Sequence, residues 1–196
     1  MFDNKENTDL EKIGEFGLID LLSKSIELTE NSTVRGIGDD AAVMHYGDNQ
    51  TLISTDLLLE GVHFDLRYVP LKHLGYKAVQ VNLSDIYAMN GMASQITFSI
   101  GLSSKFPLEA VEEIYAGAIL ACKKFNVDLV GGDTSASKQG LVISVTSIGY
   151  AKASDVTYRD GAQEGDLICV SGDLGGAYVG LQLLEREKQI FLENPN

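Results

Sequence analysis

The chain has 196 residues, a length that suits one ordinary domain with a core, or one domain and the start of another. Hydrophobic residues make up 44% and charged residues 22%, a balance typical of folded globular proteins and not of disordered ones. The formal net charge of -13 argues against a nucleic-acid-binding role through a basic surface, because phosphates would be repelled. A small phosphate ligand remains compatible with this charge if metal ions and backbone N–H groups supply the positive charge.

No apolar run approaches the roughly 18 residues that a membrane-spanning helix needs, and the first residues are polar, so a cytoplasmic location is expected. The two cysteines, Cys122 and Cys169, stand in apolar surroundings. This setting predicts two buried thiols in preference to a disulfide or a metal pair.

Apolar spacing and turn residues predict a series of alternating helices and strands. In chain order we expect a helix over 11–28, a strand over 51–55 with a further extended stretch at 61–64, a helix over 71–89 and a strand over 94–102. Pro107 then opens a helix that runs to Phe125, since proline is favoured in a first turn. Strands are expected over 127–130 and 141–150.

The segment 151–165 is polar and rich in turn residues, so we place a linker there, between a first domain over 1–150 and a second that begins at 166. After the linker, LICVSG and DLGGAYVGLQLLEREK predict a strand, a glycine turn and a helix, as the incomplete beginning of a second α+β domain over 166–196.

Aspartates beside small residues recur at the ends of the predicted elements. They lie in Gly38-Asp39-Asp40, Ser54-Thr55-Asp56, Asn82-Leu83-Ser84-Asp85 and Gly131-Gly132-Asp133-Thr134. Any one such motif is usually a turn or a helix cap. Taken together, these hard oxygen donors suit Mg²⁺, which takes one or two carboxylates, keeps some waters and borrows phosphate oxygens. The GxxxxGK[ST] phosphate loop and a strand-associated GxGxxG are both absent from the sequence.

Four segments resemble, in order and spacing, the signatures of the thiamine-monophosphate kinase family. They are GIGDDAAV (36–43), STDLLLEGVHF (54–64), YKAVQVNLSDIYAMNG (76–91) and LVGGDTS (129–135). The most specific element is STDxxxEGxHF, because GDD and GGD recur in the wider aminoimidazole-ribonucleotide synthetase superfamily. The resemblance implies an α+β fold like the N-terminal domain of that synthetase, with a mixed sheet packed with helices. It also implies a homodimer in which the sheets of two subunits pair.

The resemblance further implies roles for individual residues within an ATP- and Mg²⁺-binding domain over 1–150. The expected Mg²⁺ ligands are Asp40, Ser54, Thr55, Asp56, Asp85 and Asp133, of which Asp56 and Asp85 bridge several ions and are the catalytic pair. Gly132, Asp133, Arg159 and Tyr115 are expected to contact ATP, and His63 the phosphate of thiamine phosphate.

Each assignment has a structural alternative. In these alternatives Asp39 only shapes the turn, and Ser54 and Thr55 only end a strand. His63 would be a hydrogen-bonded histidine under a loop, and Arg159 an ordinary surface arginine. The sequence also departs from the family at IYAMNGMAS, where Tyr87 and Asn90 are bulkier than the usual residues. Family members continue past the position of Asn196 into a domain that holds the thiamine rings, so this chain is expected to be truncated at its C-terminus.

The resemblance implies that the protein phosphorylates thiamine phosphate to thiamine diphosphate, the last step of thiamine diphosphate biosynthesis, with ATP and Mg²⁺ and without nucleic-acid or membrane partners. The acceptor is a phosphate monoester with a second pKa of about 6, so no catalytic base is needed. Two alternatives stay open. One is another ATP-dependent enzyme of the superfamily with a different acceptor, and the other is a non-catalytic nucleotide- or metal-binding dimer module.

Overall fold

The structure, a computed structural model, describes residues 28–103 and 105–193, together with positions 16, 17, 19, 20, 23, 24 and 26. Most of the helix predicted over 11–28 lies outside the described residues, although Phe16, Gly17, Ile19, Asp20 and Ser23 are helical.

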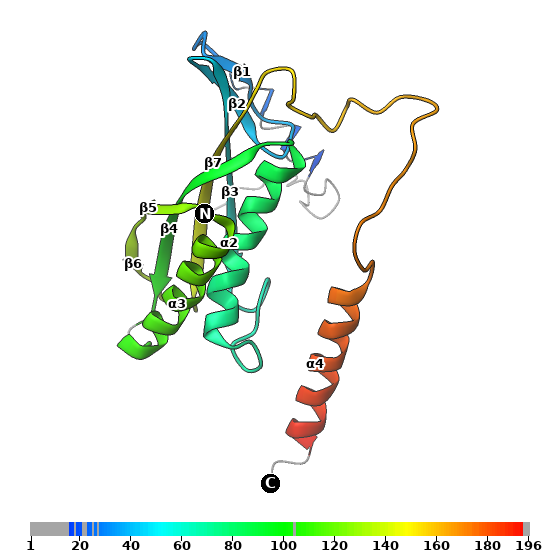
Figure 1. The fold of residues 1–196 in the computed structure, drawn as a ribbon. Coiled ribbons are helices and arrows are strands. Elements are labelled where there is room, and N and C mark those ends of the chain that lie inside the picture. Colours follow the sequence, from blue (N-terminus) through cyan, green and yellow to red (C-terminus); the bar gives the residue numbers. More distant parts are fainter. Residues whose placement is uncertain are drawn as a thin grey trace, which may run out of the picture.

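The described strands form a seven-stranded mixed sheet (Figure 1). They are β1 (Thr33–Arg35), β2 (Ala42–Tyr46), β3 (Asn49–Leu59), β4 (Met92–Leu102), β5 (Asp128–Gly131), β6 (Thr134–Ala136) and β7 (Val142–Ala151). Their order is β1-β2-β3-β7-β4-β5, and β6 also pairs with β4. β7 is antiparallel to both β3 and β4, whereas β5 and β6 are parallel to β4. The predicted α+β class is therefore confirmed.

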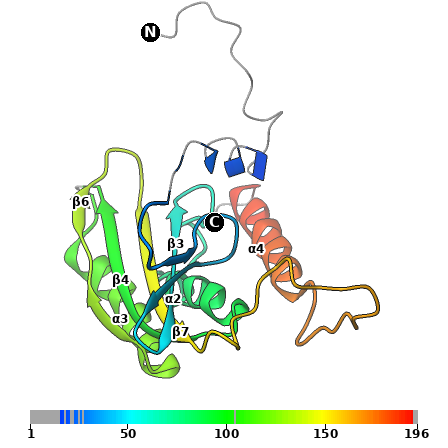
Figure 2. The ribbon, with the colours of Figure 1, turned by 90° about the horizontal axis from the view of Figure 1, so that it is seen from above.

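Two helices, α2 (Leu71–Ala88) and α3 (Leu108–Phe125), pack together on one face of this sheet (Figures 1 and 2). Strand alternation sends every second residue of β4 and β7 toward the helices. The resulting core includes Ile96, Phe98, Ile100, Ile143 and Val145 from the strands, and Leu74, Val79, Leu83, Ile114 and Ala118 from the helices. Burial of these side chains supplies the main driving force for folding.

The two helices approach so closely that glycine is required where they cross. A Cβ built on Gly75 would lie 1.9 Å from the Ile114 carbonyl oxygen, and one on Gly117 would lie 1.8 Å from the Lys72 carbonyl oxygen. Any larger residue would have to push the helices apart.

The opposite face of the sheet carries no helix within the described part of the chain. Side chains that are partly or fully exposed line it, including Thr51, Ile53 and Thr55 on β3 and Ile148 and Tyr150 on β7. An antiparallel sheet with one bare face is common, but a face that mixes threonine with isoleucine and tyrosine also suits association.

Asn90, one of the departures from the family, fits the turn that follows α2. Its backbone has φ 57°, a left-handed conformation that asparagine tolerates better than most residues. Its Nδ2 donates to the Asp155 carbonyl oxygen at 2.9 Å, and the Met89 carbonyl accepts from the Thr157 N–H at 3.1 Å. The end of α2 therefore anchors the segment that follows β7.

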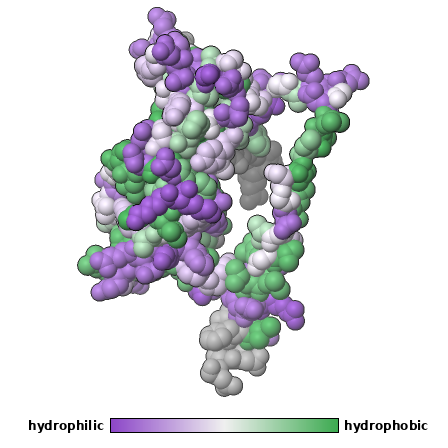
Figure 3. Space-filling model, in the orientation of Figure 1, coloured by the Kyte–Doolittle hydropathy of each residue, from purple (hydrophilic) through white to green (hydrophobic). Residues whose placement is uncertain are grey.

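Residues 152–175 form no helix or strand and lead to α4 (Gly176–Glu193). The strand predicted over 167–172 is wrong, because these residues pair with no other described strand and Leu167 and Ile168 are 89% and 99% exposed. Cys169 is exposed and its predicted burial is wrong, whereas Cys122 is buried as predicted. This segment and parts of α4 carry exposed apolar side chains of their own (Figure 3).

α4 contacts the segment that follows β3 through polar side chains. The Tyr68 hydroxyl donates to Glu185 Oε1 at 2.8 Å, and Lys188 Nζ donates to Asp65 Oδ2 at 3.1 Å. Among the described helices, none combines the length and the apolarity that crossing a bilayer requires.

The remaining predicted elements compare well with the structure. The predictions over 71–89, 94–102, 107–125, 127–130 and 141–150 are confirmed within a few residues as α2, β4, α3, β5 and β7. The predicted strand 51–55 lies within the longer β3, but the extended stretch expected at 61–64 is wrong, because residues 61–63 form a turn. β1, β2 and β6 were not predicted.

Candidate functional site

The alternation of β3 decides which of its polar side chains face α2. Ser54 and Asp56 lie on the inner face with the buried Leu52 and Leu58. Thr55 lies on the opposite face, where its Oγ1 donates to the Val145 carbonyl oxygen at 3.0 Å. The side chain of Thr55 therefore does not join those of Ser54 and Asp56.

α2 supplies the partners of both inward-facing side chains. Ser54 Oγ donates to Asp85 Oδ2 at 2.6 Å, and the Asp56 N–H donates to Asn82 Oδ1 at 2.9 Å. Asn82 is fully buried, and its Nδ2 donates to the Ala78 carbonyl oxygen at 2.8 Å. These bonds hold Asp56 and Asp85 on facing surfaces of β3 and α2.

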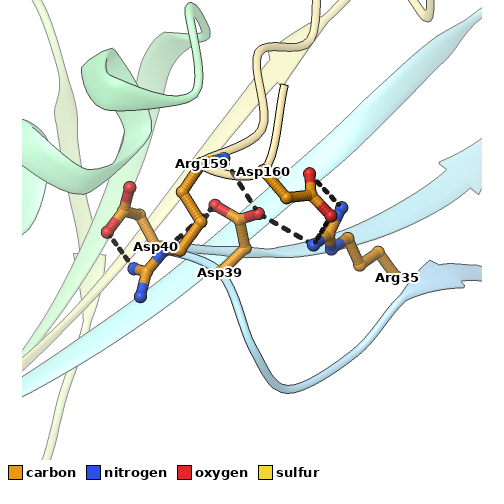
Figure 4. A network of polar contacts seen from close by, with 5 residues as sticks. All are labelled: Arg35, Asp39, Asp40, Arg159 and Asp160. Atoms are coloured by element: carbon orange, nitrogen blue, oxygen red, sulfur yellow. Dashed lines mark hydrogen bonds and ion pairs between the residues drawn. The ribbon is translucent and has the colours of Figure 1, made fainter. Parts of the chain in front are cut away.

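Asp39 and Asp40 join the site through a network of ion pairs with two arginines (Figure 4). Arg159 pairs through Nη2 with Asp40 and lies 3.7 Å through Nε from Asp39 Oδ1. Arg35 lies 3.3 Å from Asp39 and makes a bidentate pair with Asp160 at 3.3 and 2.9 Å. The side chain of Asp39 is fully buried beneath these partners and accepts from the Asp40 N–H at 3.0 Å. Asp39 therefore shapes the turn, and Asp40 faces outward.

The carboxyl group of Asp85 is partly buried and lies near other carboxylates. Burial raises the pKa of its carboxyl, and the neighbouring carboxylates of Asp56 and Asp40 raise it further. The hydrogen bond from Ser54 and the charge of Arg159 oppose this rise in pKa. A cation placed among these carboxylates would relieve the repulsion.

The donor set fits Mg²⁺ with phosphate and water completing its shell. Within the described residues, no three His, Cys, Asp or Glu side chains are close enough to hold one ion. Mg²⁺ does not require such a cage, because it is usually held by one or two carboxylates and by substrate phosphates. Asp40, Ser54, Asp56 and Asp85 offer hard oxygen donors of that kind.

His63 lies in the turn that follows β3, beside a pocket next to Asp56. The Leu59 N–H donates to His63 Nδ1 at 2.9 Å, so in the neutral ring the proton is on Nε2. The pocket is lined by Asp56, Leu57, Leu58, His63, Lys77 and Val81. His63 therefore lines a pocket together with Asp56, and its Nε2–H is left free of the bond to Leu59.

Gly132 and Asp133, in the turn between β5 and β6, and Tyr115 on α3 lie away from Asp56. In register, Asp56 is opposite Val145, Val145 is opposite Phe98, and Gly131 pairs with Thr97 on β4. Three strand spacings of about 4.8 Å each therefore separate Asp56 from the Gly131–Gly132 turn. Within one chain, these residues form a second group and do not join the Asp56 group.

The second group is closely packed against β4. A Cβ on Gly132 would lie 1.9 Å from the Phe98 carbonyl oxygen, so the turn requires glycine there. The Asp133 carbonyl accepts from the Ile100 N–H at 2.8 Å, and the ring of Tyr115 packs on that of Phe98 with centroids 5.2 Å apart. The side chain of Asp133 is exposed.

Sequence reasoning gave no role to two residues that the structure places at the site. They are Asn82, which it named only as part of the Asp85 motif, and Lys77. A buried asparagine in the apolar stripe of α2 was a usable signal for Asn82, because buried amides are kept where they satisfy backbone groups. Nothing in the sequence pattern indicated that Lys77 lines the pocket.

Residues 38–151 match the family model described as AIR synthase related protein, N-terminal domain. The chain is 39% identical over 182 residues to the thiamine-monophosphate kinase of Aquifex aeolicus, covering 93% of this chain and 56% of that protein. It is 35% identical over 174 residues to the same enzyme of Bacillus subtilis, covering 88% of this chain and 53% of the relative.

A solved structure described as AaThiL complexed with AMPPCP and TMP superposes with a TM-score of 0.83 at 38% identity, covering 93% of this chain and 56% of that chain. The chain thus spans about half the length of the curated relatives that it matches.

Proposed function

Because this chain belongs to the family of AIR synthase related proteins, we propose that it is the ATP- and Mg²⁺-binding part of a kinase acting on thiamine phosphate. The observation that carries the proposal is the approach of two carboxylates, Asp56 on β3 and Asp85 on α2, which bonds to Asn82 and Ser54 hold in place beside a pocket lined by His63. The similarity to two thiamine-monophosphate kinases over most of the chain supports this assignment.

In this proposal Asp40, Ser54, Asp56 and Asp85 would hold Mg²⁺. The metal ions supply charge neutralisation for the phosphates as negative charge shifts during transfer. Arg159 neutralises Asp40 in the structure described here. In the loaded enzyme it is available to contact the nucleotide phosphates.

His63 contributes a hydrogen bond to the acceptor phosphate from Nε2. Its Nδ1 is already engaged with the Leu59 N–H, which fixes the orientation of the ring. An oxygen of the acceptor phosphate then forms the new P–O bond to the γ-phosphorus of ATP. The bond from that phosphorus to the β,γ-bridging oxygen breaks, and ADP leaves with the electron pair. Thiamine diphosphate is the second product, and no general base takes part.

Asp133, Gly132 and Tyr115 serve the nucleotide in this proposal, with the exposed carboxylate of Asp133 as a further Mg²⁺ ligand. Their separation from Asp56 across the sheet is compatible with a site completed by a second subunit. We infer that the bare face of the sheet pairs with its equivalent in a homodimer, and we expect a cytoplasmic location.

An acceptor panel tests the function. The chain is incubated with ATP and Mg²⁺ alone, with thiamine phosphate, and with pyridoxal phosphate as a different phosphate monoester, and release of ADP is followed. ADP release that requires thiamine phosphate is the expected result. Release with another acceptor alone would favour a different enzyme of the superfamily, and ATP binding without release in any arm would favour a non-catalytic module.

A further inference from the structure

One wall of the pocket beside Asp56 is formed by α2. The pocket has a volume of about 220 Å³ and lies between β3, the turn at His63 and the α2 residues Lys77 and Val81. Lys77 and Val81 are one helical turn apart, and Asp85 follows one turn later on the same side of α2. A single edge of α2 therefore carries a lysine that lines the pocket and a carboxylate that joins the Asp56 group.

We propose that Lys77 binds the phosphate of the acceptor together with His63, and so selects a phosphorylated acceptor over the unphosphorylated alcohol. This inference rests on the proposed function. Lys77 Nζ donates to the His63 carbonyl oxygen at 2.9 Å, so the two residues are fastened to each other at the pocket wall. An ammonium group has three donors, and this contact occupies one of them.

The charges around the site favour this role for Lys77. Arg35 and Arg159 are both paired with aspartates, whereas the partner that the described residues provide for Lys77 Nζ is a neutral carbonyl. Asp56 also lines the pocket, so an incoming anion would meet repulsion from it. Lys77 supplies the positive charge that lets a phosphate monoester enter beside Asp56 before transfer.

With Lys77 in this role, the site would select an acceptor that carries a negatively charged phosphate. Near neutral pH the acceptor phosphate is largely a dianion, because its second pKa is about 6. A hydrogen bond from an ammonium group to such an oxygen is stronger than one between neutral groups. Thiamine without its phosphate would gain nothing from Lys77.

The test compares Lys77→Met with Lys77→Arg, using Lys72→Met as the control because Lys72 is exposed on the same helix. For each protein, KM is measured for thiamine phosphate and for ATP. The inhibition constant of thiamine and the direct binding of thiamine phosphate by calorimetry are also measured. Lys77→Met should raise KM for thiamine phosphate and weaken its binding by about 10- to 100-fold, as loss of a charge-assisted bond does.

KM for ATP and inhibition by thiamine should stay at the values of the unaltered chain, Lys77→Arg should retain most of the affinity, and Lys72→Met should match the unaltered chain. An unchanged KM for thiamine phosphate in Lys77→Met would overturn the inference. Equal losses for thiamine and thiamine phosphate would overturn it as well, because Lys77 would then only hold the His63 turn. If the unaltered chain neither binds nor converts thiamine phosphate, the proposed function is wrong, and the inference about Lys77 is wrong for the same reason.

Discussion

The amide of Asn82 occupies the place of a strand neighbour that β3 lacks. β2 pairs with β3 only as far as Ile53, so the Asp56 N–H has no backbone partner on that edge among the described strands. Asn82 Oδ1 accepts from this N–H, and the Ser147 hydroxyl in turn donates to the Asn82 carbonyl oxygen at 2.9 Å. A fully buried side chain thus fixes the backbone of the central carboxylate.

Replacing Asn82 with alanine should destabilise the fold by about 1–3 kcal/mol, because the buried N–H of Asp56 would lose its partner. The free energy of unfolding from urea titration measures this effect. Gln80→Ala, at an exposed position of the same helix, should change the free energy by less than about 0.5 kcal/mol. Equal values for the two variants would show that the Asn82 bonds contribute nothing.

The ionised carboxylate of Asp85 is predicted to lower the free energy of unfolding when no cation is bound at the site. Because its pKa is raised in the folded protein, the folded state binds that proton more tightly than the unfolded state does. The stability that Asp85 contributes is therefore full below the ordinary pKa of 3.8 and is lost as the pH rises through its folded-state value.

Without Mg²⁺, Asp85→Asn should therefore unfold with a larger free energy than the unaltered chain near neutral pH. The two should converge toward about pH 3, where carboxyl groups are protonated. Urea titrations in the presence of a chelator, at both pH values, measure the difference. A less stable variant at neutral pH would contradict the account of repulsion at this site.

At the scale of elements, the contact between α2 and α3 depends on Gly75 and Gly117. Gly117→Ala should destabilise the protein by about 1–3 kcal/mol or more, because its Cβ would meet backbone atoms that cannot rotate away. Gly180→Ala on α4 is the matched control, since a Cβ there meets nothing within 4 Å. The control should be neutral or stabilising, as alanine favours helix over glycine. Thermal unfolding of both variants decides the point, and a tolerated Gly117→Ala would refute the close crossing.

The elements that the sequence predicted are those with strong local signals. α3 has Pro107 at its start, Glu109 in its first turn, Lys123 and Lys124 in its last, and Asn126 in a left-handed conformation after it. The apolar run over 167–172 gave an equally clear strand signal, but a strand forms only with a neighbour, and the described residues supply none. The local sequence pattern does not indicate whether a neighbouring strand is present to pair with this segment.

For the site, as for the fold, local features could be predicted from the sequence and tertiary contacts could not. Each aspartate motif was visible in the sequence, and the period of a strand is enough to place Thr55 on the face opposite to Ser54 and Asp56. The contacts of Asn82, the approach of Arg159 to Asp40 and the position of Lys77 depend on tertiary packing of segments that are far apart in the chain. The distance of Asp133 from Asp56 likewise follows from strand order, which the sequence pattern did not indicate.

At the scale of the whole molecule, the bare face of the sheet is the surface that a homodimer would bury. Ile148 lies near the middle of that face, with Ile53 and Gln95 as its cross-strand neighbours. In sedimentation, the unaltered chain should be a dimer and Ile148→Arg a monomer, because a charge would be buried without a partner. Gln80→Arg, on the helix side, should remain a dimer. A monomeric unaltered chain, or a dimeric Ile148→Arg, would contradict the inferred pairing.

The central claim is that Asp56 and Asp85, as the residues that would hold Mg²⁺, support transfer of a phosphoryl group from ATP to thiamine phosphate. The most direct measurement is formation of thiamine diphosphate from ATP, Mg²⁺ and thiamine phosphate, read as the fluorescent thiochrome, for the unaltered chain beside Asp56→Asn. The account predicts product from the unaltered chain and a loss of about 1000-fold or more in Asp56→Asn, with the variant still folded. Near-normal turnover in Asp56→Asn, or no product from either protein, would contradict it.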